Sequence, residues 1–442
     1  MHIFSIIFLF TFFIYAKQDS LLIKSIDSLS IVDSINTILD EKTKLFTSYE
    51  LRSFNPNDGE VQYFKKQHNK NIDSIFVSND AIINKKIINQ ILNPYYDIPI
   101  GSQFSKVDEK IVKRYYFITD KPKYNFGLFD KDKLGAKFSL NPQFNSLFTS
   151  ILGINNGNRF KIVGELKMHT ENFLKNAESF DLYWKKTDST SQIMKFGVFF
   201  PHPLSLDMGI GWKYHYEIFN AYYTKNENRV MLQVFIPYLH NLKIGFVKGQ
   251  TKITNVGENN NFESLSYNAF SISINNDTRN DRLLPYKGKL IRAIIDGGLD
   301  RDIIYINSHT KMLSFYNISD NVSIKFQWIM RGLYYHKYNI PKSRYLIFGG
   351  GSTLRGYQEQ TFTSTQFQIY TIEFIYNEMS NFQTNTFIDL GSVNINPLVK
   401  HIIGFGLGIA QISESNIIKL EYALSNFNFK EGKIHLKWIN RL

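Results

Sequence analysis

The sequence contains no cysteine, which excludes disulfide bridges and thiolate metal sites and fits an exported protein. Beyond the N-terminus it also lacks any run of about 18 consecutive apolar residues, the length that a transmembrane helix requires. Ordinary membrane-spanning helices are therefore excluded. The membrane itself is not, because transmembrane β-strands turn only half of their side chains toward lipid and escape a hydropathy window.

Motifs of catalysis and cofactor binding are missing as well. The sequence has no Gly-x-Ser-x-Gly and no phosphate-binding Gly-x-x-x-x-Gly-Lys-Ser/Thr. The histidines are scattered, and His169, His202 and His215 do not have the spacing of metal ligands. We therefore expect no enzyme activity, no cofactor and no metal; a hydrolase is the weaker alternative.

The net charge is +12, yet no compact cluster of lysine and arginine stands out. Such an excess can attract anionic surfaces, such as lipid phosphates or nucleic acid. A general enrichment in lysine and asparagine explains the charge more simply. We therefore expect no nucleic-acid partner.

Residues 1–16 have the pattern of a signal peptide. The segment from Ile3 to Tyr15 is apolar except at Ser5 and Thr11, and it is too short to cross a membrane as a helix. Ala16 is a small residue at a suitable cleavage point. We expect an exported protein whose mature chain begins near residue 17.

Residues 17–142 divide into two parts. In 17–71, the segment Ser28–Leu45 has helical spacing of apolar residues, and a turn follows at Asn55–Gly59. In 72–142 the patterns predict a β-α-α-β-β order, with a strand at Ile72–Val77, helices at Asn84–Leu92 and Val107–Phe117, and a hairpin of Tyr124–Leu128 and Leu134–Leu140. That order resembles the POTRA module of outer-membrane assembly and translocation proteins, which binds extended polypeptide at a sheet edge. We expect one POTRA-like domain at 72–142 and a degenerate or partial one at 17–71.

From residue 143 to residue 442 the pattern changes to strict alternation of apolar and polar residues. Clear examples are Met208–Ile218, Val322–Trp328, Ile418–Leu424 and Ile434–Trp438. A soluble β-sandwich also alternates. A stretch of about 300 residues of strands without intervening helices, with Trp and Tyr near strand ends, favours a barrel with aromatic girdles. The expected fold is an all-β transmembrane barrel of about 16 antiparallel strands, preceded by a small periplasmic α+β region.

Three motifs in this part of the chain resemble those of the BamA/TamA superfamily of outer-membrane barrels. The first is a hairpin motif with Asp277, Arg279, Asp281, Pro285 and Gly288. The second is a loop signature, Leu354-Arg355-Gly356-Tyr357, preceded by the glycines Gly349, Gly350 and Gly351. The third is the strand motif Phe387-Ile388-Asp389-Leu390-Gly391, in which Gly391 is counted with the turn glycines. The resemblance implies that the loop folds back into the barrel and faces this strand.

Arg355 needs a partner if it lies inside a barrel, because a desolvated guanidinium is costly unless it is paired, and a bidentate carboxylate is its best partner. Asp389 points opposite to its two apolar neighbours and hence inward. Glu373 points inward by the same parity and can share the cation. The alternative is a surface salt bridge that contributes little.

The resemblance also implies a function. In this superfamily the seam between the first and last strands, here near Phe144–Ile154 and Gly432–Asn440, opens sideways and offers backbone groups to an incoming strand. The implied activity is insertion of β-barrel proteins into the outer membrane or passage of a polypeptide across it. Expected partners are outer-membrane lipid, unfolded outer-membrane or exported polypeptides and accessory lipoproteins. Alternatives are a two-partner-secretion transporter with a dedicated substrate and a passive porin.

Overall fold

The computed structural model describes residues 20–24, 47–55, 60–67, 71–78, 82–99, 104–129, 133–156, 160–188, 190–203, 206, 208–236, 239–379, 381–395, 398–425 and 428–441. The expected signal peptide, the expected helix at 28–45 and the centre of the turn at 55–59 lie outside these residues. The chain has two compact units, an N-terminal unit and a larger unit that contains the barrel.

The described part of residues 17–71 forms a small antiparallel sheet in the order β1-β3-β2, built from β1 (Ser20–Lys24), β2 (Thr47–Asn55) and β3 (Glu60–Gln67). Residues 72–142 have the predicted β-α-α-β-β order: β4 (Ser74–Val77), α2 (Lys85–Leu92), η1 (Asn93–Tyr95), α3 (Phe104–Arg114), β5 (Lys123–Phe129) and β6 (Lys133–Ser139). The sheet order is β4-β6-β5, with β4 parallel and β5 antiparallel to β6. No helix in the described residues is long and apolar enough to cross a membrane.

The helix predicted at 107–117 lies at Phe104–Arg114 instead. It ends early because three aromatic residues of low helix propensity follow, and the chain turns with a hydrogen bond from the Ile118 N–H to the Tyr115 carbonyl. Val107 and Ile111 are buried, as the helical spacing predicts.

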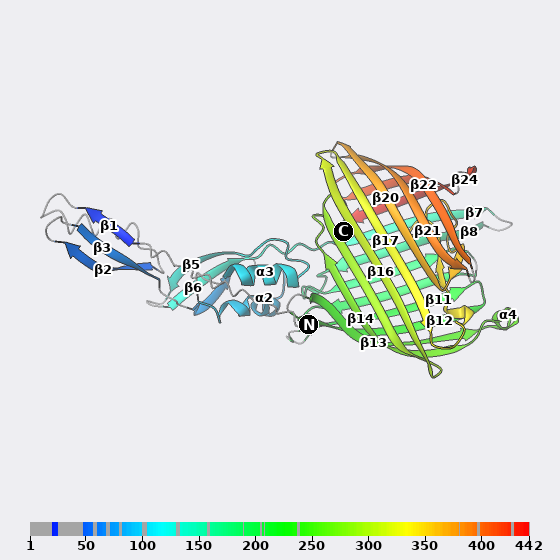
Figure 1. Ribbon diagram of the computed structural model, residues 1–442, viewed down its shortest axis with the longest axis horizontal. Coiled ribbons are helices and arrows are strands. Elements are labelled where there is room, and N and C mark those ends of the chain that lie inside the picture. The colour runs from blue at the N-terminus through cyan, green and yellow to red at the C-terminus, as the bar shows by residue number, and fades with distance from the viewer. Residues whose placement is uncertain are drawn as a thin grey trace, which may run out of the picture. The chain divides into compact units, whose positions relative to one another are not determined.

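Sixteen described strands close into an antiparallel barrel, in which each strand pairs with the next and β24 pairs with β7 (Figure 1). The strands are β7 (Leu147–Asn156), β8 (Phe160–Glu171), β9 (Ser179–Lys186), β10 (Gln192–Phe200), β11 (Gly209–Phe219), β12 (Tyr223–Ile236), β13 (Leu239–Ile253), β14 (Leu265–Asp277), β15 (Gly288–Asp300), β16 (Ile303–Ser319), β17 (Val322–Tyr335), β20 (Gln366–Met379), β21 (Phe382–Ile395), β22 (Leu398–Ile412), β23 (Asn416–Ser425) and β24 (Asn428–Arg441). A short helix, α4 (Asn255–Asn259), lies between β13 and β14. The predicted barrel and strand number are confirmed.

Side chains alternate across the barrel wall, and the large apolar ones point outward. Phe246, Phe270 and Leu407 are more than half exposed, whereas Ser271, Thr371 and Asp389 are buried on the inner face. In a β-sandwich the apolar faces of the two sheets point inward. The outward apolar face therefore distinguishes this barrel from the sandwich that alternation alone permits.

The seam between β24 and β7 is short. These strands pair over four residues each, from Trp438↔Ser150 to Arg441↔Leu147, whereas β7 pairs with β8 over ten. The two strands lie within a few residues of the ranges expected from the sequence.

Candidate functional site

The connection between β17 and β20, residues 336–365, folds into the barrel, and we call it the inward loop. Its ends pair as a two-stranded sheet of β18 (Leu346–Phe348) and β19 (Phe362–Ser364). Between these strands Gly349 and Gly350 have positive φ angles of +117° and +89°, which reverse the chain as the glycine triplet predicts. The N–H of Leu354 then donates to the Gly350 carbonyl at 3.0 Å, which presents Arg355 at the tip of the loop.

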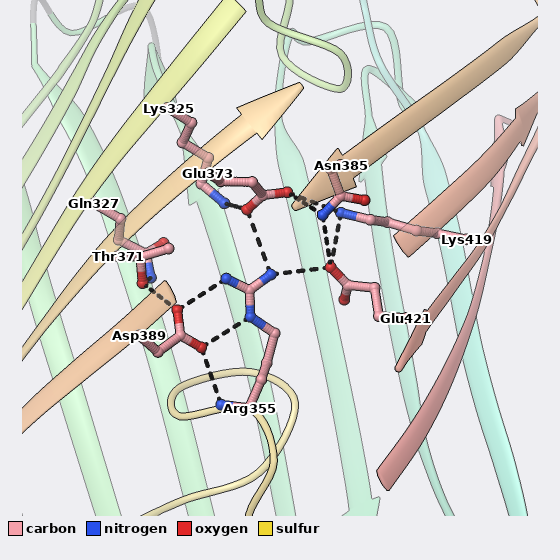
Figure 2. Close-up of polar contacts among 9 residues, drawn as sticks. All are labelled: Lys325, Gln327, Arg355, Thr371, Glu373, Asn385, Asp389, Lys419 and Glu421. Atoms are coloured by element: carbon pink, nitrogen blue, oxygen red, sulfur yellow. Dashed lines mark hydrogen bonds and ion pairs between the residues drawn. The ribbon is translucent and has the colours of Figure 1, made fainter. Parts of the chain in front are cut away.

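Arg355 forms a bidentate pair with Asp389 on β21 (Figure 2). Nε and Nη2 each donate to one carboxylate oxygen at 2.9 Å, and the Arg355 backbone N–H donates to Asp389 Oδ2 at 3.1 Å. The hydroxyl of Thr371 donates to the other oxygen at 2.8 Å. Arg355 is 7% exposed and Asp389 is 1% exposed, so this is a buried pair and not a surface salt bridge.

Two further carboxylates share the guanidinium. Nη1 of Arg355 lies 3.4 Å from Glu373 Oε2 on β20 and 3.0 Å from Glu421 Oε1 on β23 (Figure 2). Together Asp389, Glu373 and Glu421 form what we call the carboxylate cluster. The face of Phe387 lies 3.3 Å from the guanidinium carbon, which adds a cation–π contact.

Two lysines balance the remaining negative charge. Lys325 Nζ lies 2.9 Å from Glu373, and Lys419 Nζ lies 3.2 Å from Glu373 and 3.0 Å from Glu421. Asn385 also donates to Glu373 at 2.8 Å. Three carboxylates thus face three cations, which a site of low dielectric requires.

Apolar packing holds the loop beside this polar cluster. Leu354 is fully buried in a core cluster, and Tyr357 donates its hydroxyl to the Ile403 carbonyl at 3.0 Å. The other members of the core cluster are Ile329, Leu346, Phe348, Phe367, Ile369, Val393 and Ile402. Gly356 has a φ of +90°, and a Cβ there would lie 2.4 Å from the Leu424 carbonyl oxygen. The loop therefore approaches the wall more closely than any other residue type permits.

The inward loop is also attached to another part of the wall. Glu359 accepts a hydrogen bond from Lys185 on β9 at 2.6 Å and one from the Gly351 N–H at 3.0 Å. Beside it, Thr187 donates to Gln360 at 3.1 Å. The Lys185–Glu359 and Thr187–Gln360 contacts each join residues more than 170 positions apart in the sequence.

The stem of the loop has a separate anchor. Arg344 is 8% exposed, and its guanidinium carbon lies 3.8 Å from the ring centre of Tyr267 and 4.7 Å from that of Tyr305. Tyr267 in turn donates to Glu227 at 2.7 Å. We call Tyr267 and Tyr305 the aromatic cage, which stabilises a desolvated arginine through its π-faces.

The hairpin motif lies at the opposite end of the barrel, in the turn between β14 and β15. Asp277 accepts from Arg279 at 2.8 and 2.6 Å, and Asp281 accepts from the N–H groups of Leu283 and Leu284. Pro285 lies in the same turn. Gly288 has a φ of +104° and begins β15. This motif shapes a turn and is not brought together with Arg355.

One assignment from the sequence is wrong. Gly391 is not a turn glycine: it lies within β21, opposite Ile369 and Ile402. A Cβ at Gly391 would make ordinary contacts of 3.6 Å with Leu354 and Ile402, so neither a turn nor a close approach requires glycine at this position.

Sequence reasoning also missed several members of the site, namely Glu421, Lys325, Lys419, Arg344 and Lys185. A signal existed for Lys419 and Glu421, because they occupy inward positions two residues apart on one alternating strand. Within the described residues, no group of three or more His, Asp or Glu side chains is placed to hold a metal ion.

Comparison with known proteins agrees with this architecture. The family model described as the Omp85 superfamily domain matches residues 172–434, more than half of the chain. No curated protein matches the chain by sequence.

Solved structures show the same fold at low sequence identity. BamA from Haemophilus ducreyi lacking POTRA domains 1–3 is similar with a TM-score of 0.55 and 13% identity, over 94% of this chain and 93% of that one. CdiB from Acinetobacter baumannii gives a TM-score of 0.57 at 14% identity, over 94% and 82% of the two chains. CdiB from Escherichia coli gives 0.58 at 11% identity, over 94% and 85%. The chain therefore belongs to the Omp85 superfamily, and its fold is similar to the folds of BamA and CdiB.

Proposed function

We propose that this protein handles polypeptides at the outer membrane, inserting barrel proteins into it or passing a chain across it, by opening the seam between β7 and β24. In this proposal residues 17–142 lie in the periplasm, and the β-α-α-β-β unit acts as a POTRA module that receives extended polypeptide. Its partners are outer-membrane lipid, unfolded outer-membrane or exported polypeptides and accessory lipoproteins. No catalytic step and no cofactor are involved.

The seam is the observation that carries the proposal. Because β24 and β7 pair over only four residues each, residues 151–156 of β7 and 428–437 of β24 have no register partner across the seam. Unpaired N–H and C=O groups on a strand edge are a template for another strand. Every other pair of neighbouring barrel strands is joined by a longer ladder, so opening at the seam breaks the fewest hydrogen bonds.

Cross-linking of the seam tests the proposal. The chain has no cysteine, so Thr149→Cys with Ile439→Cys, a register pair across the seam, introduces a single disulfide. A matched control is Ile218→Cys with Thr224→Cys, a register pair between β11 and β12. In cells depleted of the native protein, the oxidised seam variant is expected to lose activity and to regain it on reduction, while the control stays active in both states. Full activity of a completely cross-linked seam would refute the proposal.

Depletion itself identifies the kind of activity. A general loss of outer-membrane barrels means an assembly factor, and a loss of one exported protein means a dedicated transporter. A passive porin is distinguished in planar bilayers, where large steady pores that survive deletion of residues 18–142 would contradict polypeptide handling.

A further inference from the structure

We propose that the barrel interior binds an acidic, extended polypeptide segment through lumen-facing cations on opposite walls. We call Lys213, Arg292, Lys311 and Lys437, on β11, β15, β16 and β24, the basic band. The inference rests on the proposed polypeptide-handling function and specifies the chemistry of the segment that occupies the lumen.

The strand register places like charges directly opposite each other. Arg292 faces Lys311, Lys213 faces Arg229, and Lys419 faces Lys437. Like charges in such cross-strand pairs destabilise a sheet. Arg229 has its own carboxylate, Asp296 at 2.6 Å, and Lys419 has Glu421 at 3.0 Å. Within the described residues, four cations are left without a carboxylate partner of this kind: Lys213, Lys437, Arg292 and Lys311.

None of the four cations of the basic band has a carboxylate within salt-bridge distance among the residues that the structure describes. Arg292 donates through Nε to the neutral Asn275 at 3.0 Å. Asp181, near Lys213, and Asp277, near Arg292, are already engaged: Asp181 contacts His169 at 2.7 Å, and Asp277 contacts Arg279 at 2.6 Å. The fold therefore tolerates a repulsion that it does not relieve internally.

The repulsion extends across the lumen. Lys437 lies on β24, six strands from β16 and seven strands from β15 in a barrel of sixteen. It therefore faces Lys311 and Arg292 from the far side of the lumen. Two walls thus present cations toward the same space.

This arrangement fits an extended acidic chain. Successive side chains of an extended chain point to opposite sides, so carboxylates along it reach both walls of the lumen at once. Lys213, Arg292 and Lys437 are solvent-exposed inside the barrel, which leaves them accessible to such a ligand. A small inorganic anion would reduce the repulsion between cations on only one wall of the barrel.

Binding of poly-L-glutamate to the full-length protein in detergent tests the proposal by fluorescence anisotropy. The test variant combines Arg292→Gln with Lys311→Gln, and the matched control combines Lys287→Gln with Lys289→Gln, which removes the same charge from the exposed end of the β14–β15 turn. We expect the test variant to bind about fivefold more weakly, as two modest ion pairs imply, and the control to bind within about twofold of wild type. Heat-modifiable gel mobility verifies folding of each variant, and loss of a repulsion predicts that the test variant folds normally.

Equal weakening by both variants, or unchanged binding by the test variant, would overturn the basic band as the binding site. Displacement of poly-L-glutamate by equimolar inorganic tripolyphosphate would instead assign the band to phosphate anions and overturn the polypeptide assignment. The outcome is separable from the proposed function: weak binding in a protein whose activity still requires an openable seam rejects the basic band alone. Activity that is independent of the seam rejects the proposed function.

Discussion

Replacement of Arg355 by alanine is expected to release the inward loop without dismantling the barrel. The substitution removes four polar side-chain contacts, two to Asp389 and one each to Glu373 and Glu421, and the cation–π contact with Phe387. Glu373 and Glu421 keep their lysines, so only Asp389 loses its cation. Asp389 is then a buried carboxylate held by Thr371 and a backbone N–H.

The free-energy cost of the substitution follows from this one buried carboxylate that has lost its cation. Removing one partner of a buried pair costs ~3–5 kcal/mol, and the lower end applies because two of the three acids stay neutralised. A cost of about 3 kcal/mol raises the population of the released loop about 150-fold. The sixteen-strand ladder does not depend on this contact, so the barrel persists.

Chymotrypsin measures the loop without cutting at the mutated position, since it cleaves after Tyr345, Phe348, Tyr357 and Phe362. We expect cleavage to accelerate by about two orders of magnitude when opening is in rapid equilibrium. Arg279→Ala, which removes another bidentate arginine at the far end of the barrel, is the matched control and is expected to leave the loop intact. Wild-type cleavage and full activity in Arg355→Ala would refute the reasoning.

Three further results are expected. Adding Asp389→Ala to Arg355→Ala removes the buried carboxylate that has lost its cation. The unfolding temperature of the barrel should then recover relative to the single variant, while the loop stays open. An additive loss of stability would contradict this coupling. Arg344→Ala should expose the Tyr345 site but not the Tyr357 site, at a cost of ~2 kcal/mol, and Lys342→Ala should expose neither; equal exposure of both sites would show that the aromatic cage is not a separate anchor. Burial in the turn after β10 lowers the pKa of His202 to about 4, so its neutral form stabilises the folded state fully above the unfolded pKa near 6.5, and this stability declines as the pH falls toward 4. The unfolding temperature of His202→Gln should then fall less between pH 7.5 and 4.5 than that of wild type, and parallel curves would exclude this contribution.

The sequence predicted those parts of the structure that depend on local pattern. The alternation of apolar and polar residues predicted that Asp389 and Glu373 point inward. The glycine triplet predicted the chain reversal that presents Arg355. A two-residue period fixes which side of the wall a residue faces, and glycine fixes where a reversal is cheap.

Contacts between distant strands could not be predicted in the same way. Glu421 meets Arg355 from 66 residues away, and Lys185 meets Glu359 from 174 residues away. These meetings depend on how far each strand is shifted along its neighbour, and that shift accumulates around the barrel. Arg344 gave no local signal, because its aromatic cage comes from β14 and β16.

Two of the wall attachments of the inward loop, at Arg355 and at Glu359, lie on either side of the seam. One set of contacts is on β20, β21 and β23, and the other is on β9, with β24, β7 and β8 between β23 and β9. The loop therefore bridges the segment of the wall from β23 to β9, which contains the only short ladder of the described barrel. Separation of β7 from β24 increases the distance between these two attachments. The strands therefore cannot separate widely unless the contacts of Arg355 or of Glu359 with the wall break first.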